Sequence, residues 1–84
     1  MVINESFTSA LEKVKTLDER PSNENLLKLY GLYKQATEGE VEGDRPGGFD
    51  FKAIAKYDSW ASLRNMSKED AMQSYIDLVN SLVD

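Results

Sequence analysis

Hydrophobic residues recur at intervals of three and four along four stretches of the chain, and each stretch predicts an amphipathic helix. In the first, either Asn4 or Ser6 could cap the start. The helix should end before Pro21, because proline cannot continue a helix and biases the residue before it toward extended geometry. Its apolar stripe consists of Ile3, Phe7, Ala10, Leu11 and Val14.

The other three helices have end signals of their own. A second helix is expected over residues 23–38, capped by Ser22 or Asn23 and closed by Gly39 at the position where glycine commonly ends a helix. A third is expected over residues 52–64. The fourth should begin at Ser67, because Ser67 to Asp70 approximates a capping box.

Residues 39–51 form the longest connection between the expected helices. They contain four of the five glycines as well as Pro46, and Arg45-Pro46-Gly47-Gly48 predicts a tight turn. A connection of this length suggests that the chain crosses from one end of the domain to the other. The pattern therefore predicts an all-α fold, a four-helix bundle with a long crossover between helices 2 and 3.

Several polar side chains lie within the apolar arcs of these helices. Tyr30, Tyr33 and Lys34 extend the arc of the second helix, Lys56 lies inside that of the third, and Tyr75 is near the middle of that of the fourth. Taken singly, each lysine could pack its stem and keep its ammonium in water, and each tyrosine could be a core residue. Together they suit a ligand that is anionic at one end and aromatic or apolar elsewhere.

Composition narrows the function classes. The net charge of −5 argues against nucleic-acid binding and against docking on anionic lipid, although a local basic cluster is compatible with it. The chain has no cysteine and no histidine, which removes the commonest nucleophile systems and metal ligands. We expect a cytoplasmic single domain over residues 1–84, without signal peptide, membrane span or metal site. The acidic residues from Glu38 to Asp44 are interpreted as a solvated loop.

Three motifs resemble one known family over essentially the whole chain. They are YGLYKQAT (30–37), RPGGFDFKAIAKYDSW (45–60) and SKEDAMQSYIDLV (67–79). In this order and spacing they are similar to the acyl-CoA-binding protein family. The resemblance implies an up-down-down-up bundle that binds medium- to long-chain acyl-CoA esters, with the acyl chain in an apolar groove.

The resemblance also implies roles for individual residues. Tyr30, Lys34 and Lys56 would hold the 3′-phosphate of the CoA ribose. The adenine would lie near Lys15 and Tyr33, with Tyr75 completing the site. The acyl-CoA-binding residues expected on this basis are Lys15, Tyr30, Gly31, Leu32, Tyr33, Lys34, Lys56 and Tyr75.

Three positions depart from the family pattern and bear on affinity and chain-length preference. Tyr57 stands where the family often has tryptophan, Ile54 where a charged or small residue is commoner, and Leu11 where a small residue is common near the adenine.

Three functions remain open at this point. The first is a monomeric, non-catalytic carrier that transports and buffers acyl-CoA, needs no cofactor, and has acyl-CoA-using enzymes as candidate partners. The second is an enzyme such as a thioesterase, for which no Ser–His or Cys–His system can be built. The third is a helical module whose apolar groove binds a partner helix.

Overall fold

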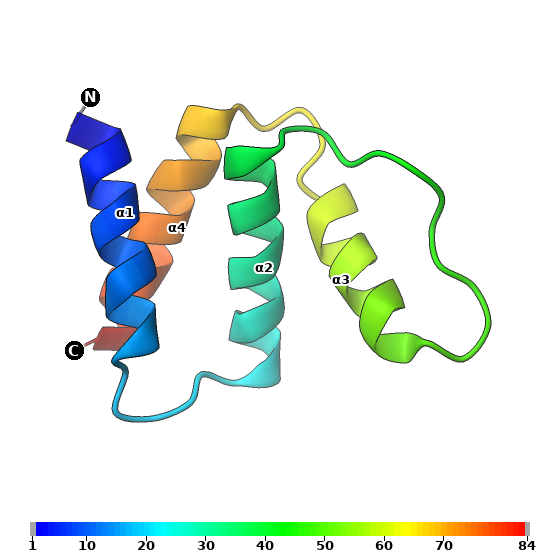
Figure 1. Ribbon diagram of the computed structural model, residues 1–84, viewed down its shortest axis with the longest axis horizontal. Helices are drawn as coiled ribbons and strands as arrows, with labels where there is room; N and C mark the ends of the chain where they lie inside the picture. Colours follow the sequence, from blue (N-terminus) through cyan, green and yellow to red (C-terminus); the bar gives the residue numbers. More distant parts are fainter. Residues whose placement is uncertain (1, 84) are drawn as a thin grey trace.

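The computed structural model describes residues 2–83, which form four helices and no strand (Figure 1). Met1 and Asp84, the two ends of the expected domain, lie outside the described residues. The helices are α1 (Val2–Lys15), α2 (Asn23–Thr37), α3 (Phe51–Ala61) and α4 (Lys68–Val83). The all-α prediction is confirmed. None of these helices combines the length and the apolar character needed to cross a bilayer.

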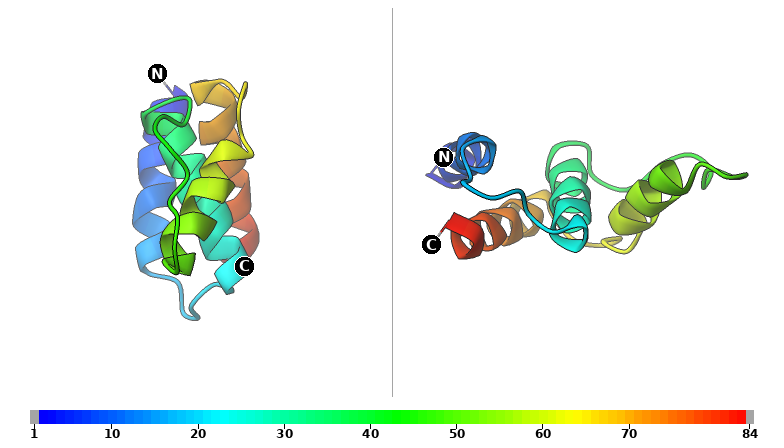
Figure 2. Two further views of the ribbon diagram at one scale, coloured as in Figure 1. Left: turned by 90° about the vertical axis from the view of Figure 1, so that its right-hand side faces the viewer. Right: turned by 90° about the horizontal axis from the view of Figure 1, so that it is seen from below.

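The helices pack in the order α1, α4, α2, α3, so that α3 contacts only α2 (Figure 2). The molecule measures 38 × 29 × 14 Å along its principal axes. In Figure 1, α2 and α3 run in one direction and α1 and α4 in the other, which is the up-down-down-up order. The segment 38–50 returns the chain from the end of α2 to the start of α3, as its length predicted.

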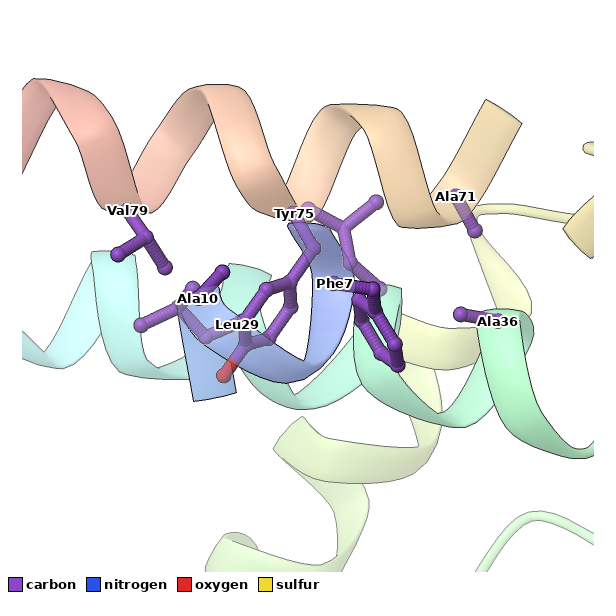
Figure 3. Packing of buried hydrophobic residues seen from close by; sticks show 8 residues of the cluster. Phe7, Ala10, Leu29, Ala36, Ala71, Tyr75 and Val79 are labelled. Atoms are coloured by element: carbon purple, nitrogen blue, oxygen red, sulfur yellow. The ribbon is translucent and has the colours of Figure 1, made fainter. Parts of the chain in front are cut away.

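The core lies between α1, α2 and α4 and consists of the stripes that the hydrophobic period predicted. Tyr75 descends from α4 toward Leu29, with Phe7 beside it (Figure 3). The ring of Phe7 meets that of Tyr75 edge-on, with centroids 5.2 Å apart. No residue of α3 is fully buried. The core residues are Phe7, Ala10, Leu29, Leu32, Ala36, Ala71, Tyr75 and Val79.

Three of the predicted helix ends are confirmed. The Ser22 hydroxyl oxygen accepts a hydrogen bond from Asn25 N at 3.1 Å, and Ser67 accepts one from Asp70 N at 3.0 Å. Gly39 has a φ of +86°, which an L side chain rarely adopts.

Three other expectations about local structure were wrong. The first helix already contains Asn4 and Ser6, because it begins at Val2, one residue before its apolar stripe. The third ends at Ala61 and continues as turns, which lead into Asn65 at a φ of +75°. The turn in the crossover lies at residues 48 and 49 rather than at 45–48, with Gly48 at a φ of +71°.

Candidate functional site

The contact between α2 and α3, here called the α2–α3 seam, is held largely by hydrogen bonds. The Trp60 indole N–H donates to Gln35 Oε1 at 3.1 Å and to the Gly39 carbonyl at 2.8 Å. Gln35 is only 1% exposed, and its Nε2 donates to the Met66 carbonyl at 2.8 Å. A buried amide is thus satisfied by partners from α3 and from the turn before α4. The seam comprises Leu27, Gly31, Lys34 and Gln35 of α2 with Ser59 and Trp60 of α3.

Glu40 completes this network, so part of the acidic run is structural rather than simply solvated. Its carboxylate accepts from Gln35 Nε2 at 3.0 Å and from the backbone N of Asn65 at 3.0 and 3.1 Å. These bonds hold the pKa of Glu40 below its usual value, with the Gln35 bond as the largest cause. Sequence reasoning missed both Gln35 and Glu40. The available signal was Gln35 itself, which lies three residues after Leu32 on the apolar stripe.

Gly31 lets the two helices approach closely. A Cβ at this position would come within 2.8 Å of the Ser59 carbonyl oxygen. The Ser59 hydroxyl in turn donates to the Leu27 carbonyl across the seam. Gly31 therefore serves helix packing, and Leu32 lies in the core at 7% exposure. Their expected role as ligand contacts stays a prediction.

Two lysines lie over aromatic rings on the α2 and α3 surfaces. Lys56 Nζ is 5.4 Å from the centroid of the Tyr30 ring, and Lys34 Nζ is 5.2 Å from that of Trp60. Lys34 also forms an ion pair with Glu38, and this hydrogen bond raises the lysine pKa. An anion that binds Lys34 would have to share it with Glu38.

A cluster of three aromatic rings, those of Phe7, Tyr33 and Tyr75, connects α1, α2 and α4. Phe7 stacks on Tyr33 at 6.4 Å with the planes 24° apart, and contacts Tyr75 as described above. Tyr33 is 41% exposed, whereas Tyr75 is 4% exposed and burial raises the pKa of its phenol. Tyr75 is thus a core residue whose ring supports the exposed Tyr33 through Phe7.

Two predicted site residues, Lys15 and Lys34, have described contacts only with residues outside the predicted set; the partners of Lys34 are Glu38 and Trp60. Lys15 is the more remote of the two in the chain. It is the last residue of α1, is exposed, and pairs with Glu12 at 3.6 Å. Of the remaining residues, the structure joins Tyr30 with Lys56, and Tyr33 with Tyr75 across Phe7.

A hollow of about 320 Å³, here called the α2–α3 hollow, opens beside Tyr30 and Lys56. Leu26, Leu27 and Ala55 supply its half-buried apolar surface. Sequence reasoning did not single out its other polar residues as binding residues, because each lies on an exposed helix end or loop, and Asn23 was considered only as a helix cap. The lining residues are Arg20, Asn23, Leu26, Leu27, Tyr30, Lys52, Ala55 and Lys56.

A larger hollow, of about 500 Å³, lies at the ends of α1 and α4 and contains none of the predicted site residues. Its walls mix Leu17 and Leu82 with Lys13, Asp18 and Glu19, so cations and carboxylates offset one another. We therefore place the candidate site at the smaller hollow, where tyrosine, lysine and apolar surface coincide.

The crossover is fastened to α3 by two polar contacts. Arg45 makes a two-point ion pair with Asp58, at 2.8 Å from Nε and 2.9 Å from Nη2. The Tyr57 hydroxyl donates to the Gly43 carbonyl at 3.1 Å. Tyr57, one of the departures from the family pattern, thus supports the crossover.

Comparison with known proteins decides the family. The family described as "Acyl CoA binding protein" matches residues 4–79. The chain belongs to the acyl-CoA-binding protein family. It is 50% identical to acyl-CoA-binding domain-containing protein 6 of Arabidopsis thaliana over 84 residues, which are all of this chain and 91% of that protein. The crystal structure of Oryza sativa acyl-CoA-binding protein 2 has 49% identity and a TM-score of 0.92, covering 98% of this chain and 89% of that one.

One relative of this acyl-CoA-binding family member is an enzyme. Rat enoyl-CoA delta isomerase 2 is 50% identical over 78 residues, which are 93% of this chain but only 20% of the isomerase. The similarity covers a small part of that enzyme, so it assigns no isomerase activity to this chain.

Proposed function

We propose that this chain is a non-catalytic carrier that binds, transports and buffers medium- to long-chain acyl-CoA esters. The observation that carries the proposal is the position of Lys56 over Tyr30 at the edge of the α2–α3 hollow, where a cation and a phenol adjoin apolar surface. Family membership and the similarity to named acyl-CoA-binding proteins support it.

In the proposed complex, Tyr30, Lys34 and Lys56 hold the 3′-phosphate, and Lys34 turns from Glu38 toward that phosphate. The adenine lies toward α1, on the exposed face of Tyr33 and near Lys15. The acyl chain covers the apolar surface of the α2–α3 hollow. Neither metal nor cofactor is required, because the function is binding alone.

Magnitudes favour joint recognition of the head group and the chain. Each buried methylene contributes about 0.8 kcal/mol, so a dozen would contribute roughly 10 kcal/mol before ordering costs. Each charge-assisted hydrogen bond to phosphate adds about 1.5–3 kcal/mol. Neither free CoA nor a free fatty acid should therefore bind as tightly as the ester.

The test is calorimetric titration with palmitoyl-CoA, free CoA and palmitate in parallel, together with an assay of ester hydrolysis. We expect one-to-one binding of the ester, much weaker binding of the other two, and an intact ester at the end. Equal binding of palmitate and ester would contradict a phosphate site, and ester turnover would restore the enzyme hypothesis.

Two substitutions separate this function from a groove for a partner helix. Lys34→Ala with Lys56→Ala should weaken ester binding at least tenfold, since about 1.4 kcal/mol corresponds to a factor of ten. The matched control is Lys28→Ala, an exposed α2 lysine that pairs with Glu24 at 3.7 Å. If the double variant bound the ester as wild type does, the site would have to lie elsewhere.

A further inference from the structure

Charge is unevenly distributed around the α2–α3 hollow. Of the chain's 10 basic residues, three line it, namely Arg20, Lys52 and Lys56, and no acidic residue in the part of the chain that the structure describes does. Within residues 2–83 the ion pairs involve Lys15, Lys28, Lys34 and Arg45, and therefore none of these three. A protein with a net charge of −5 thus concentrates cations that lack a carboxylate partner at one apolar hollow.

These three cations divide between two ends of the hollow. Lys56 lies over Tyr30, where the proposed function places the 3′-phosphate. Arg20 donates from Nη1 to Asn23 Oδ1 at 3.2 Å, which fixes the guanidinium beside the first residue of α2. Asn23 precedes Tyr30 by seven residues, or about 10 Å along the helix. Lys52 precedes Lys56 by one turn, or about 6 Å.

The parallel course of α2 and α3 brings Arg20 and Lys52 to the same end. Both helices begin at that end of the α2–α3 seam (Figure 1). Their amino ends add positive partial charge to that of the two side chains. Two acidic groups near the starts of these helices have partners of their own, since Glu24 pairs with Lys28 and Asp50 accepts from Ala53 N. Glu19, which precedes Arg20 in the chain, lines the hollow at the ends of α1 and α4 instead. This end of the hollow therefore favours an anion distinct from the 3′-phosphate.

We propose that Arg20 and Lys52 form a second anion-binding subsite, which selects acyl-CoA esters with a carboxylate at the far end of the acyl chain. The inference rests on the proposed function, because it takes the head group to lie at Tyr30 and Lys56. The chain then runs over Leu26, Leu27 and Ala55 toward the start of both helices. A terminal methyl group makes no use of the two cations there, whereas an ω-carboxylate accepts hydrogen bonds from both.

Paired titrations test the subsite. Lauroyl-CoA and its ω-carboxy counterpart, dodecanedioyl-CoA, differ only at the far end of the chain, so their affinity ratio isolates that end. We expect the wild type to prefer the dioyl ester about tenfold, because two exposed cations contribute together somewhat more than one surface ion pair. When both esters are given longer acyl chains, the affinity ratio should change. The distance between the two cation sites is fixed, so only some chain lengths place the ω-carboxylate at Arg20 and Lys52.

The variant Arg20→Gln with Lys52→Gln should abolish this preference, with its affinity for lauroyl-CoA as the reference for its affinity for the dioyl ester. Both residues are exposed, so the fold should be retained. Lys28→Gln is the control for charge alone, on the same helix but outside the hollow. Circular dichroism checks that each variant is folded. The expected result is that the two esters bind with equal affinity in the double variant, whereas Lys28→Gln keeps the wild-type preference for the dioyl ester.

Three outcomes would overturn the inference. A wild type that binds both esters equally has no such subsite. A double variant that weakens both esters to the same extent would place Arg20 and Lys52 on the head group instead. If neither ester bound the wild type, the proposed function itself would fail, and this inference would fall with it.

Discussion

The two sides of α2 are held by different forces. Toward α1 and α4 it buries Leu29, Leu32 and Ala36 in an apolar core. Toward α3 it presents Gly31 and Gln35, and the contact depends on hydrogen bonds to Ser59 and Trp60. Fully burying a large aliphatic side chain contributes about 1.5–3 kcal/mol, whereas a neutral hydrogen bond contributes a net 0.5–1.5 kcal/mol or so.

This difference explains why the candidate site lies where it does. A well-packed core leaves no room for a ligand, and α3 has no fully buried residue. A seam held by directional bonds keeps two helices in register while leaving the apolar surface of Leu26, Leu27 and Ala55 open beside it. We therefore expect the core to determine stability and the α2–α3 seam to determine the shape of the site.

The largest effect is expected in the core. Leu29→Ala removes a side chain that is 5% exposed and should lower the free energy of unfolding by about 2–5 kcal/mol. Urea unfolding followed by circular dichroism measures this change. Trp60, the sole tryptophan, lies on α3, which packs on α2. The urea midpoint reported by its fluorescence should therefore fall together with the midpoint reported by circular dichroism.

The matched control is Phe49→Ala, a larger truncation at a side chain that is 90% exposed. It should change stability by no more than about 0.5 kcal/mol. Equal losses for the two variants would contradict the assignment of the core to α1, α2 and α4.

In the seam, Gln35→Met keeps the size of the side chain and removes its hydrogen bonds. The Met66 carbonyl and Glu40 then lose a donor, at a cost of about 1–3 kcal/mol. We expect Trp60 fluorescence to change at lower urea than circular dichroism does, because the seam opens before the core. Gln73→Met, on the exposed surface of α4, is the control and should leave the two transitions coincident.

The sequence alone predicted the core better than the seam, for a physical reason. Burial imposes a period of 3.6 on a helix, so Phe7, Tyr75 and Val79 are recognisable from spacing. Some helix ends were also predicted correctly from local signals, as Ser22 and Gly39 show, whereas the start of α1 and the end of α3 were not. The polar contacts of the seam join residues far apart in the chain, and periodicity carries no information about which polar groups will meet.

In the candidate site, too, some features could be predicted from spacing and others could not. Spacing marked Tyr30 and Lys56 as polar groups on apolar faces, but only the resemblance to a family suggested that the two faces meet. Arg20 and Lys52 escaped attention because charged residues at helix starts are ordinary on any surface. Their place at one hollow depends on α2 and α3 running parallel, which follows from the crossover rather than from either helix.

A smaller effect is expected when α2 and α3 are forced apart. At Gly31→Ala the new Cβ would clash with the Ser59 backbone, which costs about 1–3 kcal/mol, while the better helix propensity of alanine returns about 1 kcal/mol. Stability should fall by about 1 kcal/mol, and Trp60 emission should shift to longer wavelength as its ring becomes more exposed. At Gly47, where an added Cβ meets nothing within 4 Å, the same substitution should change neither quantity.

The smallest effect is expected on acidification, which separates the seam from the core without a mutation. The pKa of Glu40 in the folded protein lies below its ordinary value of 4.5, so its stabilising contribution is complete above 4.5 and is lost as the pH falls through the folded value. Protonation weakens the bonds from Gln35 and from Asn65 N. We expect Trp60 emission to change in this range while the far-ultraviolet circular dichroism is retained.

Glu40→Gln identifies the group responsible. The amide oxygen still accepts from Asn65 N, but it does not titrate, so the acid-induced change in Trp60 emission should largely disappear. Asp58 also has a pKa below its ordinary value, because Arg45 donates hydrogen bonds to it. Its pair fastens the crossover rather than Trp60, so its protonation should contribute little to this signal. An unchanged titration in Glu40→Gln would mean that a carboxylate other than Glu40 couples the seam to pH.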